Sequence, residues 1–109
     1  MFEKKLTVCA LLDYYAPLLS ERHREVLDYS YNQDLSLAEI AAEVGISRQG
    51  VRDAIKKAEE ELFHLEEKLQ LRFRAEAARE AAERLLAENA DDKVRHAVEE
   101  LCEAMGLTI

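Results

Sequence analysis

Glycine and proline are scarce in this sequence: 109 residues contain three glycines and one proline, Pro17. This scarcity excludes an architecture that depends on many tight turns, because those turns draw heavily on the two residue types. What remains is rich in long runs of glutamate, alanine, leucine, lysine and arginine. Such runs are typical of helices, and the sequence therefore predicts an all-α protein.

Long apolar runs are also missing, so the sequence contains no segment expected to cross a membrane. Glu3, Lys4 and Lys5 lead into an amphipathic pattern, which differs from the apolar block of a signal peptide. The two cysteines, Cys9 and Cys102, are far apart in sequence and fall on apolar helix faces. We therefore expect a cytoplasmic protein with reduced, buried thiols and no disulfide.

Motifs for catalysis or cofactor binding are lacking as well. The sequence has no glycine-rich phosphate loop and no nucleophile motif. His23, His64 and His96 are too widely spaced to predict a metal site. Adjacent acidic residues such as Glu66 and Glu67 are expected on solvated helix faces. The sequence thus predicts neither an enzyme nor a cofactor or metal site.

The strongest local pattern begins at Ser36. Ser36 and Glu39 have the spacing of a capping box, in which each side chain satisfies a backbone N–H at a helix start. The apolar residues that follow recur at helical spacing: Leu37, Ile40, Ala41 and Val44. Gly45 then comes where a helix commonly ends in a left-handed residue. These features predict a short helix.

A second helix is predicted directly after that glycine. Ile46 is expected to fill the space at the turn with an apolar side chain, and Ser47 is a good N-cap. The buried face of this helix is expected to comprise Val51, Ala54, Ile55 and Ala58. Two helices joined in this way form a helix-turn-helix, whose DNA-binding version places the start of its second helix in the major groove.

Six outward residues are the candidate DNA-binding residues: Ser47, Arg48, Gln49, Arg52, Lys56 and Lys57. Arginine reads guanine and glutamine reads adenine, whereas lysine holds phosphates. Residues 47–58 carry a net charge of +3, although the whole chain carries −8. The local charge favours DNA, and the overall charge argues against strong nonspecific affinity. An ordinary helical hairpin with a charged outer face is the alternative.

Three segments carry a family resemblance. The first runs from Tyr14 and Tyr15 to Leu19 and is followed by Ser20, Glu21 and Arg22. The second runs from Tyr29 to Leu37 and includes Asn32, Gln33, Asp34, Leu35 and Ser36. The third begins at Glu39, Ile40 and Ala41, continues through Ser47, Arg48 and Gln49, and ends at Ile55, Lys56 and Lys57. The stretch from Ser36 resembles region 4 of bacterial sigma factors. The whole chain is similar to the YlxM family of small bacterial helix-turn-helix proteins.

The resemblance covers about residues 5–70, and the acidic helical tail is similar in character only. Gly50 and Arg52 stand where an alanine and an aromatic residue are expected. It implies a regulatory role in the signal recognition particle pathway, with a protein partner there.

Two supporting helices are predicted before the motif. The first runs from about residue 3 to residue 15, with Leu6, Cys9, Leu12 and Ala16 on one face, and Pro17 marks its end. Ser20 caps the second, which continues to about Tyr31. The four tyrosines, Tyr14, Tyr15, Tyr29 and Tyr31, are expected to pack in the core, with base stacking as the alternative.

After Lys57 the helical pattern continues, with no glycine or proline between Val51 and Met105. The candidate dimerisation residues along it are Leu62, Leu65, Leu69, Phe73, Leu85 and Leu86. A run this long favours a partner-packed helix and hence a homodimer. A bend near residues 70–74 that folds the tail back is the alternative.

The pattern first breaks at Asn89, Ala90, Asp91 and Asp92, where Asp91 or Asp92 is expected to cap a last helix. That helix places Val94, Ala97, Val98, Leu101, Cys102 and Met105 on one side and ends at Gly106. We therefore predict a helix-turn-helix domain over residues 1–70 and a helical, dimerising extension over residues 71–109.

Two functions follow from these patterns. The first is a dimeric DNA-binding regulator, which the basic cluster of the second motif helix favours. The second is an adaptor that binds a protein partner through its acidic helices, which the net charge of −8 favours.

Overall fold

The computed structural model describes residues 2–88 and 91–107, and the described backbone is almost entirely helical. The α-helices are α1 (Phe2–Tyr15), α2 (Glu21–Leu27), α3 (Leu37–Val44), α4 (Arg48–Leu69), α5 (Leu71–Glu88) and α6 (Asp92–Ala104). A 3-10 helix, Ala16–Leu18, follows α1, and a π-helix, Asp28–Asn32, extends α2. The prediction of an all-α fold is confirmed.

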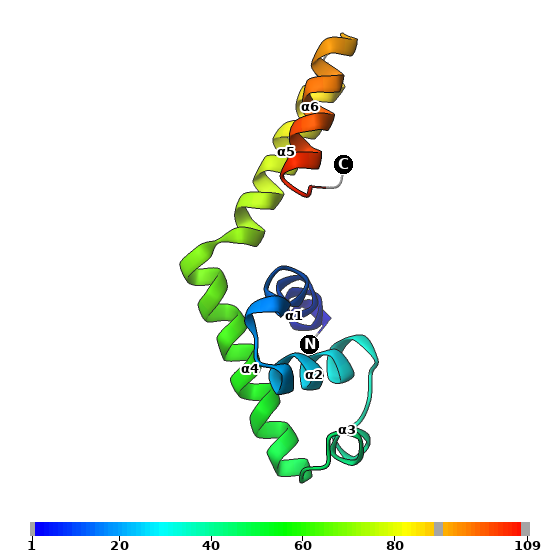
Figure 1. Cartoon of the computed structure of the whole chain (residues 1–109), viewed down its shortest axis with the longest axis vertical. Coiled ribbons are helices and arrows are strands. Elements are labelled where there is room, and N and C mark those ends of the chain that lie inside the picture. The colour runs from blue at the N-terminus through cyan, green and yellow to red at the C-terminus, as the bar shows by residue number, and fades with distance from the viewer. Residues whose placement is uncertain (1, 89–90, 108–109) are drawn as a thin grey trace. The chain divides into compact units, whose positions relative to one another are not determined.

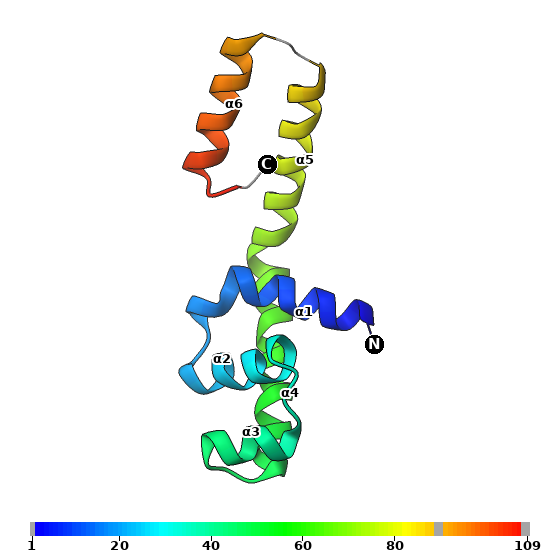
Figure 2. The ribbon, with the colours of Figure 1, turned by 90° about the vertical axis from the view of Figure 1, so that its right-hand side faces the viewer.

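The chain forms two compact units, Met1–Gln70 and Leu71–Ile109. The N-terminal unit contains α1 to α4 (Figure 1), and the C-terminal unit contains α5 and α6, which run antiparallel side by side (Figure 2). The N-terminal unit contains the helix-turn-helix motif.

One core cluster of the N-terminal unit joins α1 to α4. Its buried residues are Val8, Leu11, Leu12, Tyr15, Leu19, Leu27, Ala58 and Leu62. The predicted face of α1 is correct only in part: Leu12 is buried and Ala16 packs against the cluster, whereas Leu6 is 55% exposed and Cys9 is only half-buried. The stripe through Val8, Leu11 and Tyr15 buries more apolar volume and therefore faces the core.

A second core cluster lies beneath the motif. Val26 of α2, Ile40 of α3 and Val51 of α4 are fully buried there. Half-buried apolar residues surround them, including Leu37, Val44 and Ile46 among others. Each of the three helices thus contributes one anchor, which fixes the second motif helix against the rest of the unit.

The tyrosines pack as predicted, inside or at the edge of the core. Tyr15 is fully buried, and Tyr14, Tyr29 and Tyr31 are half-buried. The Tyr31 hydroxyl donates a hydrogen bond to the Glu59 carboxylate. Burial, followed by this hydrogen bond to an anion, raises the pKa of Tyr31 well above its usual range. The four rings therefore contribute to the packing of the two core clusters.

The helix that was predicted to continue beyond the motif ends at Leu69. Gln70 adopts a left-handed backbone conformation (φ 55°), and its N–H donates to the Glu66 carbonyl over 2.8 Å. A new helix, α5, begins at Leu71. The break falls within residues 70–74, where a bend is the alternative to one continuous helix. The single helix expected from the sequence is therefore two helices, α4 and α5.

The C-terminal unit is a helical hairpin. Asp91 caps α6 by accepting a hydrogen bond from the Lys93 N–H over 2.8 Å, as expected, whereas Asn89 and Ala90 lie outside the described residues. Val98 and Cys102 are buried against α5, but Leu101 and Met105 are 60% and 58% exposed. Only part of the predicted apolar side is therefore covered within the described part of the unit.

Candidate nucleic-acid interface

The turn between α3 and α4 occupies three residues. Gly45 is left-handed (φ 74°), and its N–H donates to the Ala41 carbonyl over 2.9 Å. A side chain would be strained at this angle, so glycine is favoured here. The Ser47 hydroxyl accepts a hydrogen bond from the Gly50 N–H over 3.0 Å and so caps α4. With Ile46 packed into the second cluster between them, the helix-turn-helix is confirmed.

The capping box at the start of α3 is also present. The Glu39 N–H donates to the Ser36 hydroxyl over 3.1 Å, and the Ser36 N–H donates to the Glu39 carboxylate over 3.0 Å. Because the backbone N–H and the hydroxyl of Ser36 both favour the charged form, the pKa of Glu39 lies below its usual value. Both ends of α3 are thus fixed by local hydrogen bonds.

All six candidate DNA-binding residues are exposed on the solvent side of the turn and of α4: Ser47, Arg48, Gln49, Arg52, Lys56 and Lys57. Ser47 already serves as the cap, so its hydroxyl has a structural role. Within residues 2–88 and 91–107, none of the four basic side chains forms an ion pair. Their charges are therefore available to an anionic ligand.

Gln49, like Ser47, is held in place by a hydrogen bond. Its amide nitrogen, Nε2, donates a 2.9 Å hydrogen bond to the Asp53 carboxylate, one helical turn further along α4. Asp53 is exposed and is the only acidic residue between Ser47 and Ala58. Glutamine and aspartate four residues apart on a helix can form such a bond, and the prediction from sequence missed it.

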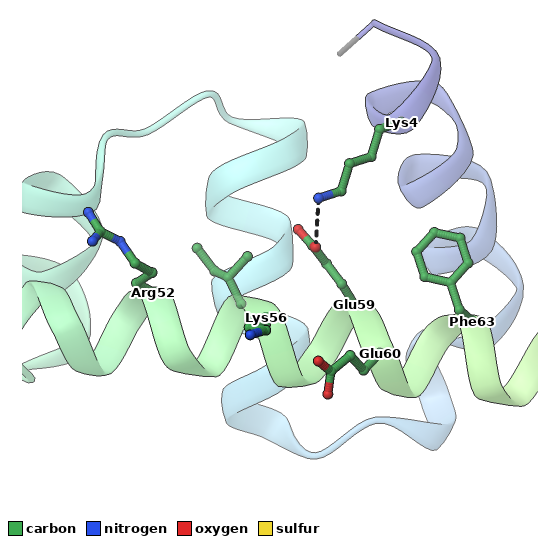
Figure 3. Close-up of a pocket in the computed structure, with 7 residues that line it drawn as sticks. Lys4, Arg52, Lys56, Glu59, Glu60 and Phe63 are labelled. Carbon is green, nitrogen blue, oxygen red and sulfur yellow. Dashed lines mark ion pairs between the residues drawn. The ribbon is translucent and has the colours of Figure 1, made fainter.

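The charge of α4 reverses at Ala58. Residues 48–57, the basic segment, carry four basic side chains and Asp53, whereas residues 59–67, the acidic segment, carry five glutamates and neither lysine nor arginine. The two segments meet at a hollow of about 510 Å³ (Figure 3). Its lining residues are Lys4, Arg52, Ile55, Lys56, Glu59, Glu60 and Phe63.

Lys4 reaches this hollow from α1, where it forms an ion pair of 3.1 Å with Glu59 (Figure 3). Sequence reasoning missed it as a neighbour of Arg52 and Lys56. The sequence around Lys4 gives no indication of this position, because only the packing of α1 on α4 brings Lys4 close to these residues. The pair neutralises the first carboxylate beyond the basic segment.

The candidate dimerisation residues are placed differently from one another. Leu62 is fully buried, and Leu65 packs against the same core cluster. Leu69, Phe73 and Leu85 are 41%, 66% and 43% exposed, and Leu86 is half-buried. The core of the N-terminal unit thus accounts for the burial of Leu62 and part of Leu65, so Leu62 offers no surface to a second copy.

Two other kinds of site are absent from the described ranges. These ranges contain no cluster of three or more histidine, cysteine, aspartate or glutamate side chains arranged to hold a metal ion. No helix in these ranges combines the length and apolar character needed to span a bilayer.

Comparison with known proteins agrees with this geometry. Residues 2–101 match the model of the UPF0122 family, described as "Putative helix-turn-helix protein, YlxM / p13 like". A UPF0122 protein of Clostridium perfringens is 36% identical over 106 residues, which cover 93% of this chain and 95% of the relative. One of Shouchella clausii is 39% identical over 101 residues, which cover 93% of each chain.

A third relative, from Clostridium kluyveri, is 52% identical over a shorter match of 69 residues. This match covers 63% of the present chain and 62% of the relative's own length, so the chain matches less than two thirds of that protein. The two full-length matches and the family model extend over both units. The chain therefore belongs to the UPF0122 family of YlxM / p13-like helix-turn-helix proteins.

Proposed function

We propose that this protein is a DNA-binding regulator in which α4 enters the major groove. The observation that carries the proposal is the set of exposed basic side chains on the second helix of a helix-turn-helix, which form no ion pairs in the described residues. The N-terminal end of this helix is the part that reaches base edges in DNA-binding motifs of this type.

Each candidate residue has a role in this arrangement. Arg48 and Gln49 lie in the first turn of α4, within reach of bases, and Arg52 lies one turn further along. Lys56 and Lys57 are suited to phosphate contacts, because lysine acts as a flexible point charge. Ser47 holds the first turn in place by capping it.

We propose further that the protein acts as a homodimer through its C-terminal unit. The two helices of this unit bury Val98 and Cys102 but leave Leu101 and Met105 more than half exposed. A second copy of the hairpin would complete a four-helix arrangement and cover these side chains. Dimers of helix-turn-helix proteins bind two half-sites, so this assembly also suits the DNA-binding role.

The process that we propose for this regulator is the signal recognition particle pathway, with the family resemblance as its only support. We expect the protein to act in the cytoplasm, because its proposed ligand, bacterial chromosomal DNA, lies there.

A second candidate function is that of an adaptor without DNA binding. The net charge of −8 and the five glutamates of the acidic segment favour it. An acidic helical surface attracts a basic partner, and it repels nucleic acid. In this case the glutamates of α5, Glu80, Glu83 and Glu88, would contribute to the partner surface.

Retention of genomic DNA fragments by the full-length protein, measured at low and at physiological salt, decides between the two functions. A DNA-binding regulator retains fragments at low salt and loses affinity steeply as salt rises, because binding releases counterions. Absence of retention at low salt would reject the DNA-binding function. The adaptor function would then lead, and reversing the charges of Glu80, Glu83 and Glu88 should abolish partner capture.

A further inference from the structure

The hydrogen bond from Gln49 to Asp53 restricts how Gln49 can meet a base. Its nitrogen Nε2 donates to the Asp53 carboxylate over 2.9 Å, and both side chains are exposed. In the described part of the chain, Asp53 makes no other side-chain hydrogen bond and no ion pair. Its carboxylate is therefore committed to Gln49, although four basic side chains share its segment.

The chemistry of the two groups fixes the orientation of the amide. An ionised carboxylate only accepts hydrogen bonds, whereas a glutamine amide has one acceptor oxygen and two N–H donors. If the amide turned over, its oxygen would face the carboxylate oxygens, and the two would repel each other. Asp53 therefore holds the amide nitrogen towards itself and leaves the oxygen and the second N–H for another partner.

One acceptor next to one donor is the pattern that adenine requires in the major groove. Its N6 amino group donates to the amide oxygen, and its N7 atom accepts from the amide N–H. A glutamine that turns freely can also present its two donors to the acceptors of guanine or thymine. Restricting the amide to one orientation therefore removes the two-donor contact with guanine or thymine and keeps the donor-and-acceptor contact with adenine.

We propose that Asp53 is a positioning residue that makes Gln49 selective for adenine at one position of the DNA site. The inference rests on the proposed DNA-binding function and adds one specific base contact to it. It also accounts for an acidic residue within the basic segment. A carboxylate there weakens attraction to phosphates, which is the cost of the selectivity that it provides.

The test is selection of binding sites from a randomised DNA library by the full-length protein and by variants. Gln49→Ala should reduce the adenine preference at a single position by about five-fold or more, since a bidentate contact is lost. Asp53→Ala should reduce the preference at that same position, while its affinity for bulk DNA is kept or raised. The double variant should show no further loss of preference beyond Gln49→Ala alone, because the two residues act as one unit.

Glu60→Ala is the matched control, because it removes an exposed carboxylate from α4 without touching Gln49. It should raise affinity for all sequences and leave the selected site unchanged. Asp53→Asn keeps the size of the side chain but can also donate to the amide oxygen, so an intermediate preference is expected. It provides the same comparison if Asp53→Ala folds poorly.

Two results would overturn the inference. Only the second would also reject the proposed DNA-binding function. An Asp53→Ala protein that binds DNA with an unchanged base preference would show that the bond only stabilises the helix, and the DNA-binding function would stand. A wild-type protein that retains no DNA fragment at low salt would reject that function and the inference together.

Discussion

The Tyr15 hydroxyl, at the end of α1, donates a 2.6 Å hydrogen bond to the Glu66 carboxylate, near the end of α4. The ring of Tyr15 is fully buried in the core, so the bond forms where a buried aromatic meets a partly exposed anion. It links the first and last helices of the N-terminal unit across 51 positions of sequence. The helix that carries the candidate interface is thereby fixed at its far end as well.

Tyr15→Phe should reduce the free energy of unfolding by about 1 kcal/mol, because it removes one hydrogen bond and leaves the ring packed. Denaturant unfolding followed by circular dichroism measures this change. Tyr14→Phe is the matched control: Tyr14 is half-buried against the same cluster and its hydroxyl makes no side-chain bond within the described residues. Equal effects of the two substitutions would mean that the Glu66 bond contributes nothing.

Glu39 should make the stability of the motif depend on pH. Its pKa in the folded protein lies below the ordinary value of 4.5, so its charged form is stabilised by folding. This contribution is fully present at pH 7 and is lost as the pH falls through the folded pKa. Glu39→Gln should therefore be less stable than the wild type at pH 7, and the difference should shrink below pH 4.5. Unfolding curves between pH 7 and pH 3 test it, and a constant difference would contradict it.

Gly50 and Ser47 should be coupled. A Cβ at position 50 would lie 3.2 Å from the Ser47 hydroxyl oxygen, which cannot move away without weakening the cap of α4. Alanine is better than glycine in a helix by about 1 kcal/mol, and this crowding opposes the gain. Gly50→Ala should thus be nearly neutral in the wild type, yet stabilise a Ser47→Ala protein by about 0.5–1 kcal/mol. Thermal unfolding of the four proteins forms the cycle, and additive effects would count against the contact.

Arginines and lysines of α4 should contribute differently to DNA binding: the arginines to base preference and the lysines to affinity for all sequences. Arg48→Ala should weaken the preferred site by about 1–3 kcal/mol and relax the base preference there. Lys56→Ala should weaken all sequences alike and reduce the salt slope by about one. Lys68→Ala, in the last turn of α4, is the control that should change neither. Titrations with specific and random DNA at two salt concentrations separate these outcomes.

The exposed leucine of α6 should control assembly. We expect the wild type to sediment as a homodimer at micromolar concentration, and Leu101→Glu to sediment as a folded monomer, because a buried unpaired charge is costly. His96→Glu is the control, since His96 is exposed and lies about 140° around the helix from Leu101. A wild type that stays a folded monomer at high concentration would reject the dimer. Leu65→Glu is less informative, because Leu65 also packs in the core and its replacement would unfold the chain.

Features that depend on neighbours in sequence were predictable. The capping box of Ser36 and Glu39, the left-handed Gly45 and the caps at Ser47 and Asp91 all follow from local hydrogen-bonding chemistry. The six outward residues of the motif were found for the same reason. A helical period assigns each side chain to a face before any packing is known.

Features that depend on distant packing were not predictable. The burial of Leu62 requires α1, which lies far away in sequence, and the approach of Lys4 to Glu59 requires the same contact. No glycine or proline marks the helix break at Gln70 in the sequence. Glutamine adopts the left-handed conformation at a cost of about 1–2 kcal/mol, so propensity alone predicts an unbroken helix.

If α4 enters a DNA groove as we propose, the charge reversal at Ala58 should limit the depth of entry. The basic segment of ten residues measures about 15 Å at 1.5 Å per residue, close to the 12 Å width of the major groove. Beyond it the acidic segment meets the phosphate backbone with a like charge, which opposes deeper or sideways insertion. In the proposed complex, one helix would carry both the attraction that brings DNA to its first three turns and the repulsion that fixes the depth and the direction of approach.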